Sequence, residues 1–302
     1  MGRQPARRPA AKPGMTTAAK QATTDAATDP RTLKGPALRA ARAAVDDAQL
    51  LIYDAWELPP GQRKPIAIRA LQISPLCADA HGMLAALSPP GSDEELALWQ
   101  RAVAAGTLAI GKKGFEELAG EFWGWLETRP YMRSMFGLAV AEWRRGLREA
   151  AIARLQEMIR LNPNDNQGVR DVLAFWLLEC GQDAAFDALN AQYEDDWSAL
   201  LIYAGTLAEF RRSGESEESA NALRRALMRN PLVPELLLGR RKRPERRAAT
   251  YAMGSLEEAF YVVDEGEGAW RSTAGALEWL ARHAPPLKAS SRRGSPAAIT
   301  KE

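Results

Sequence analysis

Histidine and cysteine are the residues of this chain best suited to metal binding or nucleophilic catalysis, and there are two of each. His81 and His283 are far apart in the sequence, and neither has a second histidine or a cysteine pair at the spacing of zinc ligands. Cys77 and His81 are four residues apart, which would place them on one face of a helix. A buried cysteine beside a partly exposed histidine explains this pair, so we predict no zinc site and no catalytic pair here.

Three other short motifs are also explained without chemistry. Residues 111–114 (GKKG) lack the further glycines and the preceding strand of a phosphate-binding loop. Residues 162–166 (NPNDN) lack the glycine and the closing glutamate of a calcium loop, and are expected to form a turn and a helix N-cap. The carboxylate pairs at 46–47 and 195–196 lie in polar surroundings. We therefore expect a chain that is not an enzyme and that uses no cofactor or metal.

The densest group of charges is the basic run at residues 240–247 (RRKRPERR). Clustered arginines can bind phosphates, so one hypothesis is binding to nucleic acid or to another anionic surface. A solvated loop between helices is the simpler interpretation, because no aromatic residue is interleaved to stack on bases. The net charge of +2 over the whole chain adds no general attraction to nucleic acid, which we regard as an improbable partner.

A 34-residue period organises the middle of the chain, and it is the period of helical-hairpin repeats. Asn-Pro pairs end at Pro163 and Pro231, 68 residues apart, and two glycines, Gly146 and Gly214, have the same separation. Two further series step by 34 residues: Ala151, Ala185 and Ser219, and Leu155, Leu189 and Leu223. Trp197 takes the place of the proline in the middle copy, so we expect that junction to differ. The three leucines are predicted to be buried between paired helices.

The rest of the chain is also predicted to be helical, which makes the fold class all-α. Ala, Leu, Arg and Glu dominate the periodic segments, and alternating β-branched runs are hard to find. The expected organisation is a disordered basic tail at 1–36, repeat-like hairpins at 37–131, three repeats at 132–233, C-terminal helices at 234–284 and a flexible tail at 285–302. No stretch is long and apolar enough to span a membrane, and the basic N-terminus lacks the apolar segment of a secretory signal. Two unpaired cysteines are typical of a cytoplasmic protein.

The repeats resemble the tetratricopeptide repeat family, with departures. Where that family has Trp, Leu-Gly and Tyr along the first helix, the third copy has Tyr203, Thr206-Leu207 and Phe210. A narrower resemblance, over roughly residues 130–282, is to the suppression-of-tumorigenicity-seven family; it is carried by residues 166–193, 230–238, 254–259 and 275–277. Both resemblances imply a right-handed helical-repeat solenoid that acts as a scaffold without catalytic residues. The membrane segments of the animal members are missing from this sequence.

In a repeat of this type the first helix of each hairpin lines a concave groove that binds a peptide or a partner helix. The positions expected to face the groove, and predicted to bind a partner, are Arg133, Phe136, Val140, Trp143, Gln167, Arg170 and Arg211. They describe an apolar stripe flanked by arginines. The alternative is that the chain's own C-terminal segment, through Trp270, Leu277 and Trp279, occupies the groove. The identity of the partner does not follow from the sequence.

Overall fold

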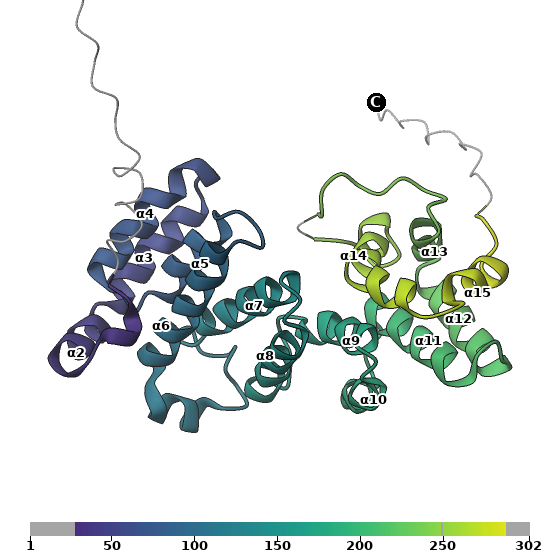
Figure 1. Ribbon diagram of the computed structural model, residues 1–302, viewed down its shortest axis with the longest axis horizontal. Helices are drawn as coiled ribbons and strands as arrows, with labels where there is room; N and C mark the ends of the chain where they lie inside the picture. Colours follow the sequence, from purple (N-terminus) through teal and green to yellow (C-terminus); the bar gives the residue numbers. More distant parts are fainter. Residues whose placement is uncertain (1–27, 249, 288–302) are drawn as a thin grey trace, which may run out of the picture. The chain divides into compact units, whose positions relative to one another are not determined.

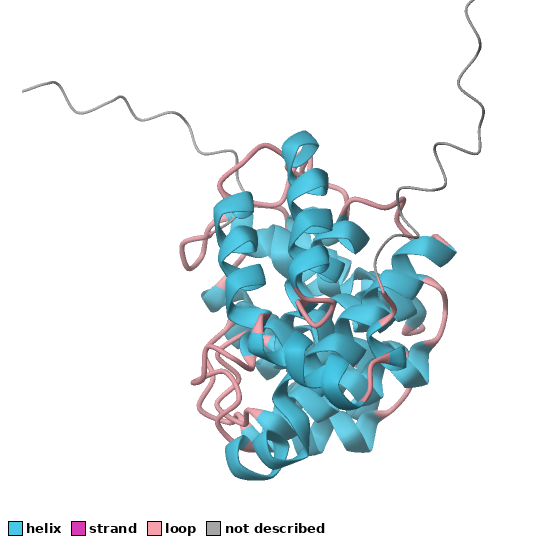
Figure 2. Cartoon of the chain, turned by 90° about the vertical axis from the view of Figure 1, so that its left-hand side faces the viewer, coloured by secondary structure: helices cyan, strands magenta, loops and turns pink. Residues whose placement is uncertain are grey.

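The computed structural model describes residues 28–248 and 250–287. The predicted tails were 1–36 and 285–302, and their residues 1–27 and 288–302 lie outside the described residues. Within residues 28–36, the first helical turn already spans Pro30–Thr32, which departs from the predicted tail. Asp29 caps this turn, because its side chain accepts from the backbone N–H of Arg31. All regular structure in the described residues is helical, as Figure 2 shows, so the all-α prediction is confirmed for this part of the chain. No helix within it is long and apolar enough to cross a membrane.

The chain divides into two compact units, residues 1–146 and 147–302. The boundary lies at the turn after Gly146, inside the first predicted repeat. In unit 1, consecutive helices pack against each other, and α5 also contacts α3 and α7. Its α-helices are α2 (Gly35–Ala43), α3 (Val45–Trp56), α4 (Pro60–Ile73), α5 (Ala78–Ala86), α6 (Asp93–Leu118) and α7 (Arg129–Arg144).

The core of unit 1 is made largely of alanine and aliphatic side chains. Ile52 of α3, Leu71 of α4 and Leu98 of α6 are buried there among alanines such as Ala48 and Ala80. Small side chains at helix contacts let the helix axes approach closely, so α3, α4 and α5 form one tight cluster. Among the aromatic side chains of the unit, Phe122 and Tyr131 are also buried, whereas Tyr53, Trp56 and Trp125 are exposed.

Unit 2 contains the remaining helices, and one of them covers two others. Its helices are α8 (Arg148–Leu161), α9 (Val169–Glu179), α10 (Asp183–Gln192), α11 (Ala199–Ser213), α12 (Glu217–Arg229), α13 (Leu232–Leu237), α14 (Leu256–Ser272) and α15 (Ala276–His283). Helices α9 and α10, and α11 and α12, pack as neighbours, and α14 lies against both α9 and α11 (Figure 1). The chain's own C-terminal segment thus covers the first helices of the second and third predicted repeats.

Close approach of α14 depends on two glycines that the sequence would suggest as helix breakers. A Cβ atom at Gly266 would lie 2.6 Å from the ring of Phe175 on α9, and one at Gly268 would collide with the carboxylate of Glu179. Glycine inside a helix costs about 1 kcal/mol relative to alanine. Here it permits contact with α9, and α14 continues without interruption to Ser272.

The glycine turns and the buried leucines at the 34-residue period are observed, and paired helices pack against each other in the second and third predicted repeats, α9 with α10 and α11 with α12. Gly146, Gly181 and Gly214 follow α7, α9 and α11 with φ of 76°, 70° and 63°, a conformation that glycine adopts without the steric penalty of a Cβ. Three leucines at the 34-residue period are buried, at 0%, 7% and 1% exposure: Leu155, Leu189 and Leu223.

The aromatic-rich segment at residues 115–126 is helical only as far as Leu118. Helix α6 runs from Asp93 to Leu118, with a kink where Gly111 has φ of 69°, and residues 119–128 form turns. Phe122 is fully buried and the side chain of Thr128 donates to its carbonyl, so packing and a local hydrogen bond replace helical bonds. Aromatic content alone does not distinguish a helix from a tightly packed turn.

Candidate functional site

A hollow of about 300 Å³ in unit 1 is bounded by two tryptophans and two arginines. Trp56 comes from the end of α3, Trp99 from α6 and Arg133 from α7, while Arg63 of α4 lies at the rim. Asp79 of α5 completes the polar part, and Met83 and Leu87 complete the apolar part. Indole faces and guanidinium groups are the side chains that contribute most to binding at protein interfaces. We call this site the indole–arginine pocket.

Trp99 is fixed in the pocket by two interior glycines on neighbouring helices. A Cβ at Gly82 of α5 would lie 2.8 Å from its ring, and a Cβ at Gly137 of α7 would overlap the same ring. The ring therefore lies directly on the backbones of α5 and α7, a close approach that only glycine allows. This packing holds the wall of the pocket in place before any partner binds.

Arg133 is held in the pocket by a buried carboxylate. Its guanidinium forms a two-point ion pair with Asp79, with the Nε–Oδ1 distance at 2.9 Å, and its Cζ lies 4.9 Å from the centroid of the Trp56 ring. Asp79 also accepts from Gln49 Nε2 at 2.8 Å. Arg63 donates to the backbone carbonyls of Leu58 and Trp56. Among the groups lining the pocket, two cations face one anion, which leaves one positive charge uncompensated.

Exposed apolar side chains extend from the pocket along α3. Leu50 is 62% exposed, Tyr53 38% and Trp56 37%, and they follow one another at helical spacing. A second hollow of about 420 Å³ lies beside Leu50 and Tyr53 and includes Leu126, itself 62% exposed. Large apolar side chains grouped around hollows indicate an interaction surface more strongly than single exposed ones do.

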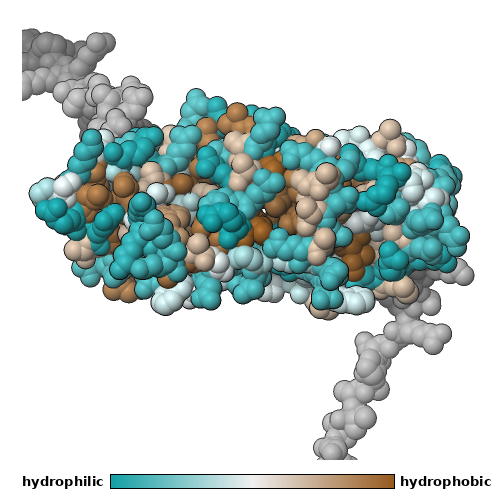
Figure 3. Space-filling model, turned by 90° about the horizontal axis from the view of Figure 1, so that it is seen from below, coloured by the Kyte–Doolittle hydropathy of each residue, from teal (hydrophilic) through white to brown (hydrophobic). Residues whose placement is uncertain are grey.

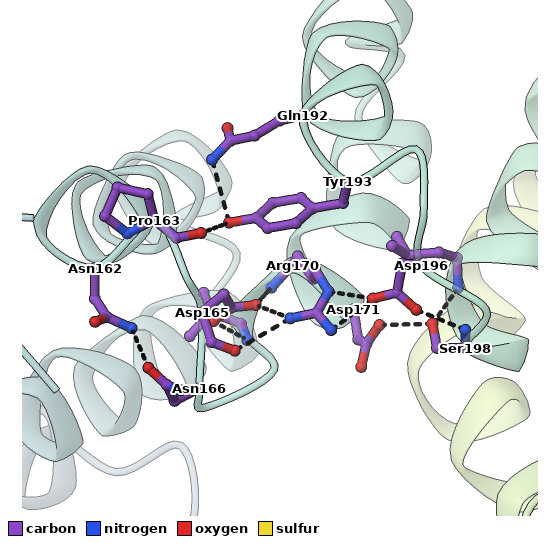
Figure 4. A network of polar contacts seen from close by, with 12 residues as sticks. Asn162, Pro163, Asp165, Asn166, Arg170, Asp171, Gln192, Tyr193, Asp196 and Ser198 are labelled. Carbon is purple, nitrogen blue, oxygen red and sulfur yellow. Dashed lines mark hydrogen bonds and ion pairs between the residues drawn. The ribbon is translucent and has the colours of Figure 1, made fainter. Parts of the chain in front are cut away.

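Unit 2 carries a polar network centred on Arg170, drawn in Figure 4. The guanidinium of Arg170 bonds Asp165, which precedes α9, with Nη1–Oδ2 at 3.0 Å, and Asp196, which precedes α11, with Nε–Oδ2 at 2.6 Å. It also lies 5.1 Å from the ring centroid of Tyr193, whose hydroxyl donates to the carbonyl of Pro163. One arginine thus joins the loop before α9 to the loop before α11.

Asp171, the next residue of α9, is a half-buried carboxylate in the same network. It accepts from the hydroxyl of Ser198 at 3.2 Å. Burial raises the pKa of Asp171 to about 7, opposed by the charge of Arg170 and reinforced by Asp196. The pKa of Asp165 is also raised by burial, against the hydrogen bonds from the backbone of Arg170 and Val169. Asp171 is therefore the carboxylate of this network that exchanges a proton near neutral pH.

Trp197 projects from the loop that this network holds. Its side chain is 76% exposed, although the residues on both sides are fixed: Ser198 N–H donates to Asp196 Oδ1 at 2.6 Å, and Arg229 Nε donates to the carbonyl of Trp197 at 2.6 Å. The preceding Glu194 and Asp195 are exposed, and neither has an ion-pair partner among the described residues. We call residues 194–197 (EDDW) the tryptophan loop. The sequence predicted only that this junction would differ from the Asn-Pro junctions.

The seven predicted partner-binding residues are found in different surroundings. Arg133 lines the indole–arginine pocket, and Phe136, Val140 and Trp143 are half-buried further along α7. Arg170 is engaged in its network, and Gln167 precedes α9. Arg211 is tied within unit 2: it pairs with Asp183 and donates to Leu178 O and to Thr273 Oγ1.

Sequence reasoning missed four residues of the pocket: Trp56, Asp79, Arg63 and Trp99. They lie outside the segment with the clear 34-residue period, so no repeat position could be assigned to them. Gly137 was a usable signal, because a glycine inside a helical pattern often marks the close approach of another group.

The basic run at 240–247 lies on a loop, and several of its cations are paired with acidic residues of unit 2. Arg243 pairs with Glu267 at 2.8 Å, and Arg247 pairs with Asp264 and Glu265 and lies over the ring of Tyr261. Arg240 donates to the carbonyl oxygens of Ala281 and Ala284. These bonds tie the loop to α14 and α15 and reduce the charge available to an anionic ligand.

Cys77 and His81 are both buried and bond different groups. The thiol is 3.8 Å from Gln49 Oε1, and burial raises its pKa to about 12. His81 Nε2 lies 3.0 Å from the carbonyl of Pro75, and burial lowers its pKa to about 4. A thiol and an imidazole with these pKa values are both neutral at pH 7. Within the described residues, no group of three His, Cys, Asp or Glu side chains is placed to hold a metal ion.

Comparison of the chain with protein-family models, with curated proteins and with solved structures gave no match. The resemblances to the tetratricopeptide repeat and suppression-of-tumorigenicity-seven families therefore stay predictions.

Asp171→Asn should make the protein more stable at pH 8. The folded pKa of Asp171, about 7, is above the unfolded value, so folding binds a proton between about pH 4 and pH 7. This contribution to stability is present at low pH and is lost as the pH rises through 7. The asparagine keeps the acceptor for Ser198 without the charge. We expect a gain on the order of 1–3 kcal/mol at pH 8, and a smaller difference at pH 5, in urea unfolding.

The matched control for this prediction is Asp195→Asn, which removes an exposed carboxylate from the adjoining loop. It should change stability by less than about 0.5 kcal/mol at either pH. Equal pH dependence of the wild-type chain and of Asp171→Asn would show that Asp171 is ionised throughout this range.

Proposed function

We propose that this protein is a non-catalytic interaction scaffold, built from helical hairpins of the tetratricopeptide type, that binds a peptide or helix of a partner protein on unit 1. The observation that carries the proposal is the indole–arginine pocket, with the exposed side chains of α3 beside it. The first helices of the successive hairpins, α3, α5 and α7, contact one another and all contribute to the pocket.

Unit 2 supports the choice of unit 1 as the docking surface. There α14 already lies against the first helices α9 and α11, and groove positions such as Leu177 and Ala204 are buried. In unit 1 no described helix covers Leu50, Tyr53 and Trp56 to the same degree. Apolar surface on the face drawn in Figure 3 is limited to separate patches among hydrophilic side chains, so a local docking surface fits the rest of the protein.

The chemistry of the pocket defines the partner. Two indole walls and the methylene surface of Met83 and Leu87 suit one large apolar or aromatic side chain. Arg133 is paired with Asp79, so the uncompensated charge is that of Arg63, and it favours an acidic residue beside that anchor. We therefore propose a segment with an aromatic or aliphatic anchor and neighbouring carboxylates. Binding of nucleic acid by the 240–247 run has less support, because Arg243 and Arg247 are paired with carboxylates.

Selection from a random-peptide library on the immobilised full-length protein tests the proposal. Enriched peptides should carry an anchor of this type with adjacent Asp or Glu. Their affinity, measured by fluorescence polarisation, should fall about 30-fold or more in Trp56→Ala, the effect of removing an interface tryptophan worth about 2 kcal/mol. Trp125→Ala is the matched control, because this tryptophan of unit 1 is 46% exposed and does not line the pocket. Equal affinities for both variants would contradict the proposal.

A further inference from the structure

The tryptophan loop of unit 2 has the chemistry that the indole–arginine pocket of unit 1 would select. Trp197 offers a large aromatic side chain that is 76% exposed, the highest exposure of any tryptophan among the described residues. Its neighbours Glu194 and Asp195 offer two carboxylates without ion-pair partners in the described part of the chain. The pocket offers two indole walls, an unmatched positive charge and room for one aromatic side chain.

Both surfaces are fixed before they meet, which lowers the entropy that association must overcome. The pocket is held by Gly82 and Gly137 against Trp99 and by Asp79 against Arg133. The backbone of the tryptophan loop is held by the Arg170 network (Figure 4) and by the bond from Arg229 to the carbonyl of Trp197. A tryptophan on a loop whose backbone is already held offers a large contact area at a low cost in conformational entropy.

We propose that the tryptophan loop of one molecule binds in the indole–arginine pocket of a second copy of this chain. In this contact the ring of Trp197 lies between Trp56 and Trp99, and Glu194 and Asp195 lie near Arg63 and Arg133. The proposal rests on the function proposed above and names its partner. The contact joins two different surfaces, so it is heterologous, and each copy retains an unused pocket or an unused loop unless the assembly closes.

Charge complementarity favours this occupant over the N-terminal segment of the chain. Residues 1–27 contain Arg3, Arg7, Arg8, Lys12 and Lys20 and only one acid, Asp25, so they carry the same sign of charge as the pocket. Their aromatic content is zero. The tryptophan loop, in contrast, is negatively charged and contains an aromatic side chain.

Sedimentation equilibrium of the full chain with two single variants tests the proposal. The wild-type chain should show a mass that rises with concentration. Trp197→Ala and Trp56→Ala should each self-associate at least about 30-fold more weakly than the wild type, since each removes one half of the contact. An equimolar mixture of the two should recover association, because the first variant keeps its pocket and the second keeps its loop. Neither side chain is buried, and circular dichroism verifies that both variants are folded.

Several further results would decide the matter. Trp125→Ala should associate like the wild type, and Glu194→Gln with Asp195→Asn should weaken association most at low salt, where charges are least screened. A wild-type chain that stays monomeric up to about 0.5 mM, or a mixture of variants that does not associate, would overturn the proposal. If self-association is absent but library peptides still bind the pocket of Trp197→Ala, the scaffold function stands and only its partner is different. If they do not bind, both proposals fail.

Discussion

Replacing Trp279 with alanine should destabilise the protein by about 3–5 kcal/mol, the range for removing a large aromatic side chain from a core. Trp279 of α15 is fully buried, and its ring stacks on Phe210 of α11 with centroids 4.6 Å apart and planes at 24°. Aromatic pairs of this kind stabilise by more than the area they bury. The loss should appear as a lower midpoint of urea unfolding.

The stability of Trp279→Ala should be compared with that of two other variants. Trp197→Ala removes the same side chain from an exposed position and should change stability by less than about 0.5 kcal/mol. Trp279→Phe should cost less than alanine, because phenylalanine keeps the stacking on Phe210 and removes an indole N–H that has no acceptor among the described residues. Similar midpoints for Trp279→Ala and Trp197→Ala would show that α15 does not pack on α11.

Replacing Glu258 with alanine should cost about 2–4 kcal/mol, by leaving the half-buried cation of Arg229 and two further donors without their shared acceptor. Glu258, at the start of α14, is 1% exposed and accepts from Arg229 at 2.6 Å and 3.2 Å. Asn230 Nδ2 at 2.9 Å and the backbone N–H of Gly254 at 2.7 Å also donate to it. These four donors come from the end of α12 and from the segment before α14, so one carboxylate joins both to the helix.

Glu257→Ala is the control for this prediction, since Glu257 is exposed one residue earlier on the same helix. We expect it to unfold within about 0.5 kcal/mol of the wild type in the same urea experiment. If Glu257→Ala and Glu258→Ala had equal effects, the ion pair with Arg229 would not form in solution.

The helices and their turns could be predicted from the sequence because their causes are local. Ser92 and Ser255, each followed by a glutamate three residues later, indicate helix starts, and both serine side chains accept from that glutamate's backbone N–H. Gly146, Gly181 and Gly214 indicate the turns by their own conformational freedom. The period of 34 residues then placed Leu155, Leu189 and Leu223 inside.

The indole–arginine pocket could not be predicted in the same way. It forms because Trp99 of α6 reaches the backbones of Gly82 and Gly137, residues from two other helices. That contact depends on how three helices pack, and no spacing in the sequence encodes it. The ion pair of Arg170 could not be predicted either. Its position along α9 predicted a side chain facing the groove, but its partner Asp196 is 26 residues away in the sequence, and no local pattern joins the two.

The position of α14 also has a consequence for synthesis of the chain. Helices α9 and α11 are translated before α14 and α15, which pack on them and end at His283. At about 5–20 residues per second, the 105 residues from Glu179 to His283 take roughly 5–20 s to translate. During that interval the ribosome-bound chain presents Phe175, and Phe210 once it has been made, without their final neighbours. Unit 1 can complete its fold before unit 2, and a transcript that stops before residue 256 would yield a product prone to aggregation.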